Sequence, residues 1–203
     1  VDACGNPHAV LSNMFNDRRN QEVSYINSFL SGHHYQTHRI ASRTDGFYFE
    51  SMGDALWIPG KRFILGGFGF RSDKRIYDIL SQTTQAPVAI FELTHPKFYH
   101  LDTCLSILNA DTALACKDAF TDEGWELLAR IFSQIIEVPL LEADSPSFAC
   151  NAHCPNGKHV ILQSGCVETE ILMRDKGFIP VAVDTSEFIK SGGSVFCMKL
   201  MFF

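Results

Sequence analysis

One arrangement of strands and helices recurs along this chain and limits the folds that it can adopt. Each copy reads as an apolar strand, a turn and a second apolar strand. The copies, regular in the middle of the chain and less so at its ends, cover residues 3–15, 47–70, 98–120, 147–164 and 191–203. Their turns are predicted at Asn6–Pro7, Pro59–Gly60, 109–111 and 155–157.

Stretches with helical spacing separate these hairpins, and a short strand follows each one. Helices are predicted at Lys74–Gln82, Asp122–Ile136 and Val167–Lys176, and the strands that follow them at 88–93, 137–142 and 178–183. In the middle helix, Trp125, Leu128 and Phe132 share one face. The unit is therefore strand–turn–strand–helix–strand, with a period of about 40–50 residues that is typical of closed or stacked repeats.

The helix inside each unit excludes an all-β propeller blade. We therefore expect an α/β fold, a five-fold pseudosymmetric α/β propeller of ββαβ modules with sheet edges toward a central axis. Four units and a final hairpin make nearly five, so we expect the chain to lack part of its N-terminal portion. With 46% hydrophobic residues, residues 1–203 are expected to form a single domain.

Charge and hydropathy argue against large classes of partner. The net charge is −6, and the chain contains no basic run of the kind that binds nucleic acid. No apolar run approaches the roughly 20 residues that a membrane span requires. We expect neither nucleic acid nor a membrane as partner, and the sequence leaves open whether the chain forms an oligomer.

The seven cysteines are scattered and include no CxxC pair. A chain with its own core does not need disulfide bonds, so free thiols in the cytoplasm are expected. The densest group of metal-ligating types is Cys150, His153, Cys154 and His159, all within ten residues. Zinc sites usually combine one close pair with a second pair further along the chain. We therefore expect no metal.

Ionisable residues interrupt the apolar hairpins at matching places. Glu50 and Asp54 lie in the first strand of one unit, and His100 and Asp102 lie in that of the next. Cys197 follows a glycine pair in the last hairpin. Burying such groups costs free energy unless they are paired or functional. In a ring, equivalent positions converge on the axis, where a nucleophile, an acid/base and an orienting carboxylate could meet.

Simpler interpretations exist for each of these residues. Cys197 could be an inert packed cysteine of a final strand, because cysteine is among the most buried residue types. Asp54 and Asp102 could satisfy turns, and His100 could be a tolerated strand histidine. The glycine-rich segment 66–70 lacks the GxGxxG spacing of a phosphate-binding loop.

The motifs FESMGDALW, GGFGFRSD, HLDT and SGGSVFC, in this order, resemble the guanidine-modifying pentein superfamily. Its members include arginine deiminases, dimethylarginine dimethylaminohydrolases and glycine amidinotransferases. The resemblance covers the chain from about Phe47 to its end, and more weakly from Val1. It implies a five-bladed α/β propeller, in agreement with the ring expected from the repeats.

The resemblance also implies roles for individual residues. Cys197 matches the nucleophile, His100 the general acid/base and Glu50 the carboxylate paired with that histidine. Asp102 matches an acid that binds the substrate guanidinium, and Asp54 matches the acid that closes the Glu-Gly-Gly-Asp motif of the family. Here that motif is one residue longer.

Two more positions are implied to contact substrate. Arg71 matches an arginine that meets the substrate carboxylate in some members. Asp2 is the available acid near the start, where the family carries a further substrate-binding acid, and it is offset by one residue. This departure weakens any inference about which guanidine is bound.

The chemistry of guanidine hydrolysis explains these residue types without reference to the family. Carboxylates hold a planar guanidinium through charge-assisted bonds, and a thiolate attacks its central carbon. His100 then protonates the departing amine and activates water. We expect a hydrolase acting on a small-molecule guanidine such as arginine or a methylarginine, without a cofactor. The alternatives are an amidinotransferase, in which a second amine replaces water, and a non-catalytic binding protein with this fold.

Overall fold

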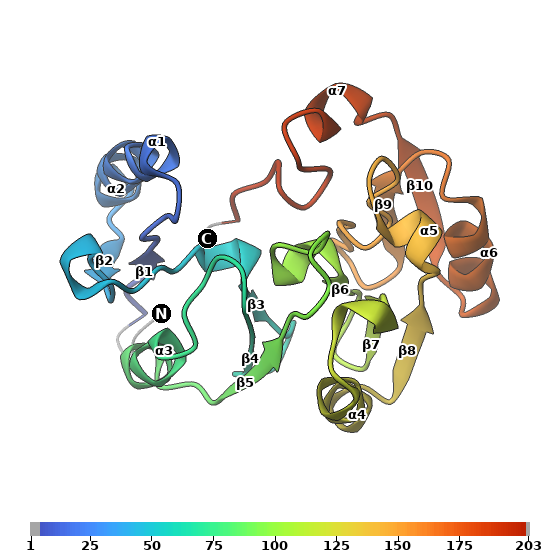
Figure 1. Cartoon of the computed structure of the whole chain (residues 1–203), viewed down its shortest axis with the longest axis horizontal. Helices are drawn as coiled ribbons and strands as arrows, with labels where there is room; N and C mark the ends of the chain where they lie inside the picture. The colour runs from blue at the N-terminus through green and yellow to red at the C-terminus, as the bar shows by residue number, and fades with distance from the viewer. Residues whose placement is uncertain (1–4, 202–203) are drawn as a thin grey trace.

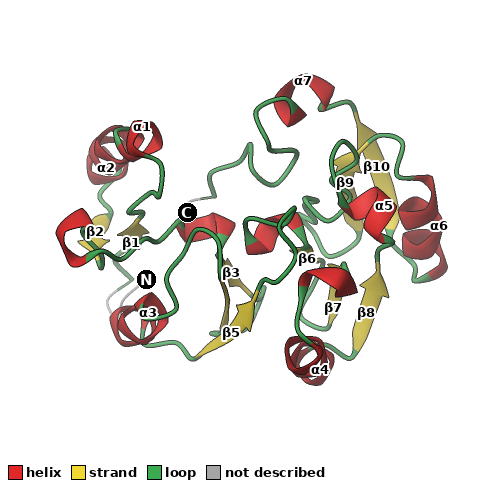
Figure 2. Cartoon of the chain, in the orientation of Figure 1, coloured by secondary structure: helices red, strands yellow, loops and turns green. Residues whose placement is uncertain are grey.

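The computed structural model describes residues 5–201, apart from the side chain of Arg43. Figure 1 shows four units that follow one another around an arc, from β1 and β2 at one end to β9 and β10 at the other. The longer helices α2, α3, α4 and α6 lie toward the outside of this arc (Figure 2). After α7, the C-terminal segment returns toward the middle, where the turns of the other units also lie (Figure 1).

The two middle units have the predicted ββαβ plan. In the second unit β3 (Ala55–Trp57) pairs antiparallel with β4 (Ile64–Phe68), which pairs parallel with β5 (Val88–Glu92) across helix α3 (Ile76–Thr84). The third unit repeats this topology, and its elements are β6 (Leu105–Ile107), β7 (Thr112–Ala115), helix α4 (Asp122–Ile131) and β8 (Gln134–Glu137).

The outer units each have a parallel pair of strands. In the first unit β1 (His8–Leu11) pairs with β2 (Gln36–Arg39), and α1 (Asp17–Asn20) and α2 (Glu22–Gly32) lie between them in the chain. In the fourth, β9 (His159–Gln163) pairs with β10 (Ile179–Val183) across α6 (Val167–Asp175). The remaining short elements are α5 (Leu140–Ala143), α7 (Ser186–Ile189) and the 3-10 helices η1 (Arg43–Asp45), η2 (Ser51–Gly53), η3 (Leu101–Thr103) and η4 (Lys117–Ala119).

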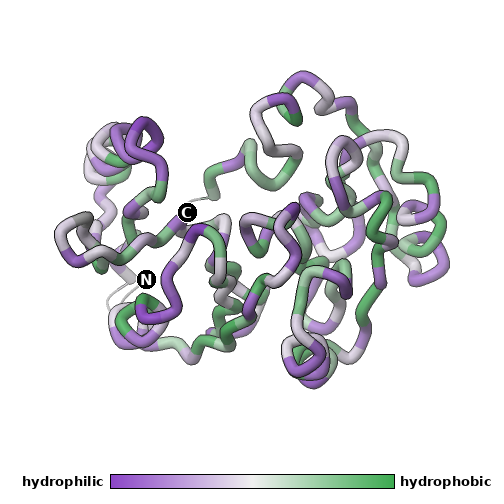
Figure 3. Tube along the Cα trace, viewed as in Figure 1, coloured by the Kyte–Doolittle hydropathy of each residue, from purple (hydrophilic) through white to green (hydrophobic). Residues whose placement is uncertain are grey.

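Local sequence explains where the central helix begins. The side-chain oxygen of Thr121 accepts a hydrogen bond from the N–H of Gly124 and so caps α4. Asp122 and Glu123 then place negative charge at the positive end of the helix dipole. Leu128 points into the core while the other face of the helix remains polar, as the alternating colours of Figure 3 show.

One continuous apolar core joins the second, third and fourth units. Leu65, Leu114 and Leu162 come from the central strands of these three units and are fully buried. One smaller apolar cluster lies within the first unit, and another packs the buried face of α3 against β4. The units therefore depend on one another for burial, as expected for repeats that cannot bury an apolar face alone.

Several predicted elements differ from the structure. The segments that carry Glu50 and His100 are not strands, because a 3-10 helix precedes β3 and β6. The helix predicted at Asp122–Ile136 ends at Ile131, and the next strand is 134–137 rather than 137–142. Apolar residues continue from the helix into the strand, so the spacing of apolar residues did not indicate where the helix ends.

The two terminal hairpins are not formed within the described residues. Residues 191–201 contain turns and no strand, so Cys197 lies in a turn rather than in a final strand. At the other end, residue 8 starts a strand that pairs with β2. Sequence analysis missed α2, whose apolar pattern is blurred because Val23 and Leu30 are buried while Tyr25 and Phe29 are exposed.

In the described part of the chain, no helix is long and apolar enough to cross a membrane. The six cysteines described there are all free thiols, namely Cys104, Cys116, Cys150, Cys154, Cys166 and Cys197.

Truncating the shared core should unfold all the units together. Leu114→Ala removes a side chain with 0% exposure from the centre of the third unit, so we expect the free energy of unfolding to fall by about 2–5 kcal/mol. Leu141→Ala is the control, because Leu141 is 86% exposed, and it should cost less than about 0.5 kcal/mol. Urea unfolding measures both, and equal losses in the two variants would contradict this description of the core.

Candidate active site

The predicted catalytic residues come from turns at the inner ends of different units. Glu50 and His100 each precede a 3-10 helix, η2 and η3 respectively, and each 3-10 helix leads into the first strand of its unit. Cys197 lies in the turn that follows α7. The structure brings these three turns together although 147 residues separate the first from the last.

His100 and Glu50 form a direct pair. Nε2 of His100 lies 2.5 Å from Oε2 of Glu50, and the other Glu50 oxygen accepts a hydrogen bond from the N–H of Phe15 at 2.8 Å. Burial alone would lower the pKa of His100, but the hydrogen bond to Glu50 and the nearby carboxylates raise its pKa above the ordinary value. Burial raises the pKa of Glu50, whereas His100 and the Phe15 N–H outweigh it and lower that pKa overall. The pair therefore favours an imidazolium beside a carboxylate.

The close approach of this pair requires a glycine. A Cβ on Gly53 would lie 2.7 Å from Nδ1 of His100, closer than such atoms approach in proteins. The glycine of the FESMGDALW motif thus makes room for the imidazole ring.

Asp54 lies behind the histidine rather than open to solvent. It is 1% exposed, and its two carboxylate oxygens accept hydrogen bonds from the N–H of Leu101 at 2.9 Å and the hydroxyl of Ser72 at 2.7 Å. Burial raises the pKa of Asp54 in spite of these bonds and of the His100 charge. Asp54 therefore joins the turns that carry Glu50 and His100.

Cys197 and Asp102 form the second half of the site. The Sγ–Oδ2 distance is 3.2 Å, which allows the thiol to donate a hydrogen bond to the carboxylate. The other oxygen, Oδ1, is buried and has no hydrogen-bond partner among the described residues; it lies 3.9 Å from Nδ1 of His100. Burial raises the pKa of Asp102 to about 6, although the His100 charge acts in the opposite direction.

The surroundings of the Cys197 thiol favour its neutral form. Loss of contact with water and the charge of Asp102 raise the pKa of Cys197 well above that of an ordinary thiol. A thiolate here needs a further positive charge, which a cation bound against Asp102 would supply. The position of the sulfur requires a glycine at residue 193, because a Cβ on Gly193 would lie 3.2 Å from Sγ of Cys197 and 2.7 Å from its Cβ.

Arg71 lies beside the His100–Glu50 pair. Its guanidinium is 3.8 Å from Oε1 of Glu50, and it stacks over the rings of Phe15 and Tyr99 at 5.5 and 5.2 Å. The hydroxyl of Tyr99 donates a hydrogen bond to the carbonyl of Gly192, next to the turn that carries Cys197. These contacts place a fixed positive charge at the edge of the site.

Sequence analysis missed one residue of this site, Asn151, whose side-chain amide lies 3.1 Å from Sγ of Cys197. Asn151 occupies the turn of the fourth unit that corresponds to the turns of Glu50 and His100 in the second and third. The signal that could have identified it is a polar residue inside the apolar run Ala149–Ala152, which overlaps the group of metal-ligating residue types at Cys150–His159.

Two other predictions concern this region. Asp2 lies outside the described residues, and its role stays a prediction. Within the described part of the chain, no cluster of three or more His, Cys, Asp or Glu side chains could hold a metal ion.

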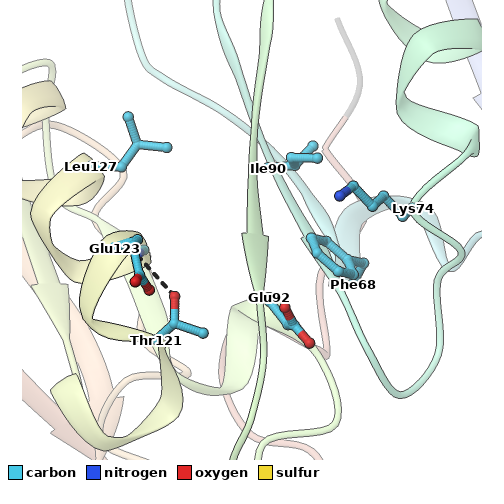
Figure 4. A pocket seen from close by; sticks show the side chains of 8 residues that line it. Phe68, Lys74, Ile90, Glu92, Thr121, Glu123 and Leu127 are labelled. Carbon is cyan, nitrogen blue, oxygen red and sulfur yellow. Dashed lines mark hydrogen bonds between the residues drawn. The ribbon is translucent and has the colours of Figure 1, made fainter.

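A shallow pocket between β4, β5 and α4 contains none of the predicted site residues. Phe68, Lys74, Glu92 and Thr121 are among the residues that line it, and Figure 4 shows the acidic side chains of Glu92 and Glu123 on opposite sides. Neither a cysteine nor a histidine is among the residues that line this pocket.

Comparisons with known proteins agree with this arrangement. N(G),N(G)-dimethylarginine dimethylaminohydrolase from Mycobacterium tuberculosis is 38% identical over 151 residues, which are 74% of this chain and 48% of that protein. The bifunctional arginine dihydrolase/ornithine cyclodeaminase AgrE from Nostoc is 27% identical over 194 residues, 95% of this chain and 27% of that protein. The chain thus spans about half the length, or less, of these curated relatives.

Solved structures share the fold. The N-terminal domain of ArgZ bound to product, described as an arginine dihydrolase from cyanobacteria, superposes with a TM-score of 0.87 at 26% identity, over 94% of this chain and 68% of that one. This match confirms an α/β fold of the pentein type.

The match to a family model extends over nearly the whole chain. The model described as "N,N dimethylarginine dimethylhydrolase, eukaryotic" covers residues 3–203, including every turn that carries a residue of the site. The chain therefore belongs to the eukaryotic N,N-dimethylarginine dimethylhydrolase family, within the pentein superfamily that its motifs resemble.

Proposed function

We propose that this chain is a cysteine-dependent hydrolase acting on the guanidine carbon of arginine or a methylarginine. Residues 1–203 would serve as a single catalytic domain. The observation that carries the proposal is the contact between the Cys197 thiol and Asp102. The second oxygen of Asp102 is buried beside the His100–Glu50 pair and has no hydrogen-bond partner within residues 5–201. A buried acceptor next to a thiol fits a cationic substrate that presents N–H groups.

Binding would begin at the carboxylates. A guanidinium donating to Oδ1 of Asp102 gives this oxygen the hydrogen bond that it lacks and supplies a positive charge next to Sγ. That charge would lower the pKa of the Cys197 thiol, so that the thiolate forms when substrate is present. Arg71, held between two rings, would pair with the substrate carboxylate, and Asp2 stays a predicted further contact.

Chemistry would follow in two halves. The Cys197 thiol releases its proton to solvent when the guanidinium binds, and the Sγ thiolate forms a bond to the central guanidine carbon while the C=N π electrons move onto nitrogen. The C–N bond to the departing amine then breaks as the His100 imidazolium protonates that nitrogen, which leaves an amidino-thioether on Cys197. Glu50 stabilises the imidazolium before this proton transfer by its hydrogen bond at 2.5 Å, and it holds the ring in place afterwards.

In the second half, neutral His100 takes a proton from water as the oxygen attacks the thioether carbon. The C–S bond breaks as the C=O bond forms, the departing sulfur takes the proton of the new hydroxyl group, and the ureido product leaves. Names of relatives at 38% and 27% identity refer to hydrolases, which favours water over a second amine as the incoming nucleophile. The assembled thiol, imidazole and carboxylates also argue against a purely binding protein.

The closure of the fold into a propeller, the location of the protein and its small-molecule partner are also part of this proposal. The repeated ββαβ units arranged around an arc support a five-fold propeller, although the described residues form four separate small sheets. The free cysteines support a cytoplasmic location, and the small-molecule guanidine remains the proposed partner.

The first prediction concerns the nucleophile. Cys197→Ala should lower the rate of ureido product formation from arginine and methylarginines by at least about 10³-fold, because no other group can form the thioether. In [18O]water, one labelled oxygen should enter the product, detected by mass spectrometry. Cys154→Ala, at another free cysteine, is the control and should retain the wild-type rate; a Cys197→Ala variant that also does so would contradict the assignment.

The second prediction concerns the buried charge of Asp102. A carboxyl group whose pKa is raised by folding from 3.8 to about 6 destabilises the folded state as pH rises, and the whole cost, about 3 kcal/mol, is present above pH 6. Asp102→Asn should therefore unfold at higher urea concentration than wild type at pH 8, with the advantage about halved at pH 5. The variant should have lost guanidine turnover.

A matched control separates this effect from removal of any carboxylate. Asp175→Asn changes an exposed residue at the end of α6 and should show no such gain at pH 8. If Asp102→Asn were no more stable than wild type at pH 8, the buried charge would not carry the proposed cost.

A further inference from the structure

We propose that Asn151 is a positioning residue for the nucleophile: it fixes the turn that carries Cys197 and donates the hydrogen bond that stabilises the thiolate. The inference deepens the proposed function, since it assumes that Cys197 is the nucleophile. No motif of the sequence analysis includes Asn151, and its place in the site follows from the contacts below.

The side chain of Asn151 is completely buried and touches both halves of the site. Its oxygen accepts hydrogen bonds from two backbone N–H groups of the nucleophile turn, those of Ser194 at 3.1 Å and Cys197 at 3.2 Å. Its amide nitrogen lies 2.9 Å from the backbone carbonyl of Asp102 and 3.1 Å from Sγ of Cys197. One amide therefore ties the nucleophile to the turn that carries the proposed guanidinium acceptor.

The orientation of this amide is fixed by its partners. Backbone N–H groups can only donate, so the atom facing Ser194 and Cys197 must be the oxygen. The carbonyl of Asp102 can only accept, so the atom facing it must be the NH₂ group. The contact to Sγ is consequently a donation from Asn151 to sulfur, while the thiol proton is directed to Asp102.

This geometry gives Asn151 an electrostatic role in addition to a structural one. The thiol sits between a carboxylate, which opposes ionisation, and an amide N–H, which favours it. When the thiol proton leaves, the N–H of Asn151 remains directed at the sulfur and no group has to move. Such a preformed donor stabilises the charged nucleophile at no reorganisation cost.

Other titratable groups also face the sulfur. Asp102 and Tyr99 approach it from the third unit. Lys199, on the same segment as Cys197, interacts with the charge of Asp102, and burial lowers the pKa of the lysine to about 8. Because these groups are unchanged in Asn151 variants, a change in thiol ionisation in those variants reports on the amide itself.

The test is the pH dependence of Cys197 alkylation by iodoacetamide in the full chain, followed by intact mass. Asn151→Asp keeps an oxygen for the two N–H groups but replaces the donor with an acceptor, so the pH of half-maximal alkylation rate should rise by about one unit or more. Asn151→Ala should raise it as well. A Cys197→Ala sample identifies alkylation at any other thiol.

Asn109→Asp is the matched control. The side-chain oxygen of Asn109 also accepts two backbone N–H groups, those of Asp111 and Thr112 at 2.9 and 2.8 Å, in the turn between β6 and β7. Its alkylation profile should equal that of wild type. Folded Asn151 variants with the wild-type profile would overturn the proposal.

A second measurement needs no variant at Asn151. In wild-type protein, the side-chain ¹⁵NH₂ resonance of Asn151 should shift over the pH range in which alkylation of Cys197 rises, and this shift should vanish in Cys197→Ala. A resonance that does not change over that range would overturn the proposal even if every Asn151 variant failed to fold. Neither readout requires turnover, so absence of guanidine hydrolysis would contradict the proposed function and leave this inference separately testable.

Discussion

The contact between the Asp102 carboxylate and the Cys197 thiol sets the conditions for the rest of the site. A buried carboxylate with one oxygen that lacks a partner in the described part of the chain destabilises the folded protein, and its charge raises the pKa of the adjacent thiol. Binding of a cation that carries N–H groups would stabilise the buried carboxylate and lower the pKa of the thiol. The neighbouring residues have complementary roles in the proposed reaction. His100, paired with Glu50, supplies a proton for the leaving group, and Asn151 supplies a hydrogen-bond donor for the sulfur. The resting site thus matches a guanidinium in charge and in hydrogen bonding.

The repeated unit explains how one site is built from segments far apart in the chain. In the second, third and fourth units, the turn before the first strand projects a polar side chain to the inner end of its unit, and the three side chains are Glu50, His100 and Asn151. The helices and the apolar core hold these turns in place, while the side chains differ. Gly53 and Gly193 allow the close contacts that the site requires, because a Cβ at either position would collide with His100 or Cys197.

Much of this arrangement could be predicted from the sequence, because the repeat fixes both the topology and the convergence of equivalent positions. The ββαβ order of the middle units and the grouping of Glu50, His100 and Cys197 are present in the structure. The 3-10 helices before β3 and β6 could not be predicted, since three residues of tight turn leave the apolar alternation unchanged. The substrate contact of Asp54 stays a prediction; in the structure its two oxygens accept hydrogen bonds from Ser72 and Leu101. Asn151 was missed because its contacts depend on the path of the C-terminal turn, which carries no periodic signal.

The central claim is that Sγ of Cys197 forms a covalent bond to a guanidine carbon. The most direct measurement is an intact-mass spectrum of the protein quenched in acid during reaction with arginine or a methylarginine, followed by peptide mapping. The account predicts a substrate-dependent mass increase on the peptide that contains Cys197, equal to the mass of the substrate less that of the departing amine. Product formation with no adduct on that peptide, under conditions in which an adduct on a control cysteine enzyme is trapped, would contradict it.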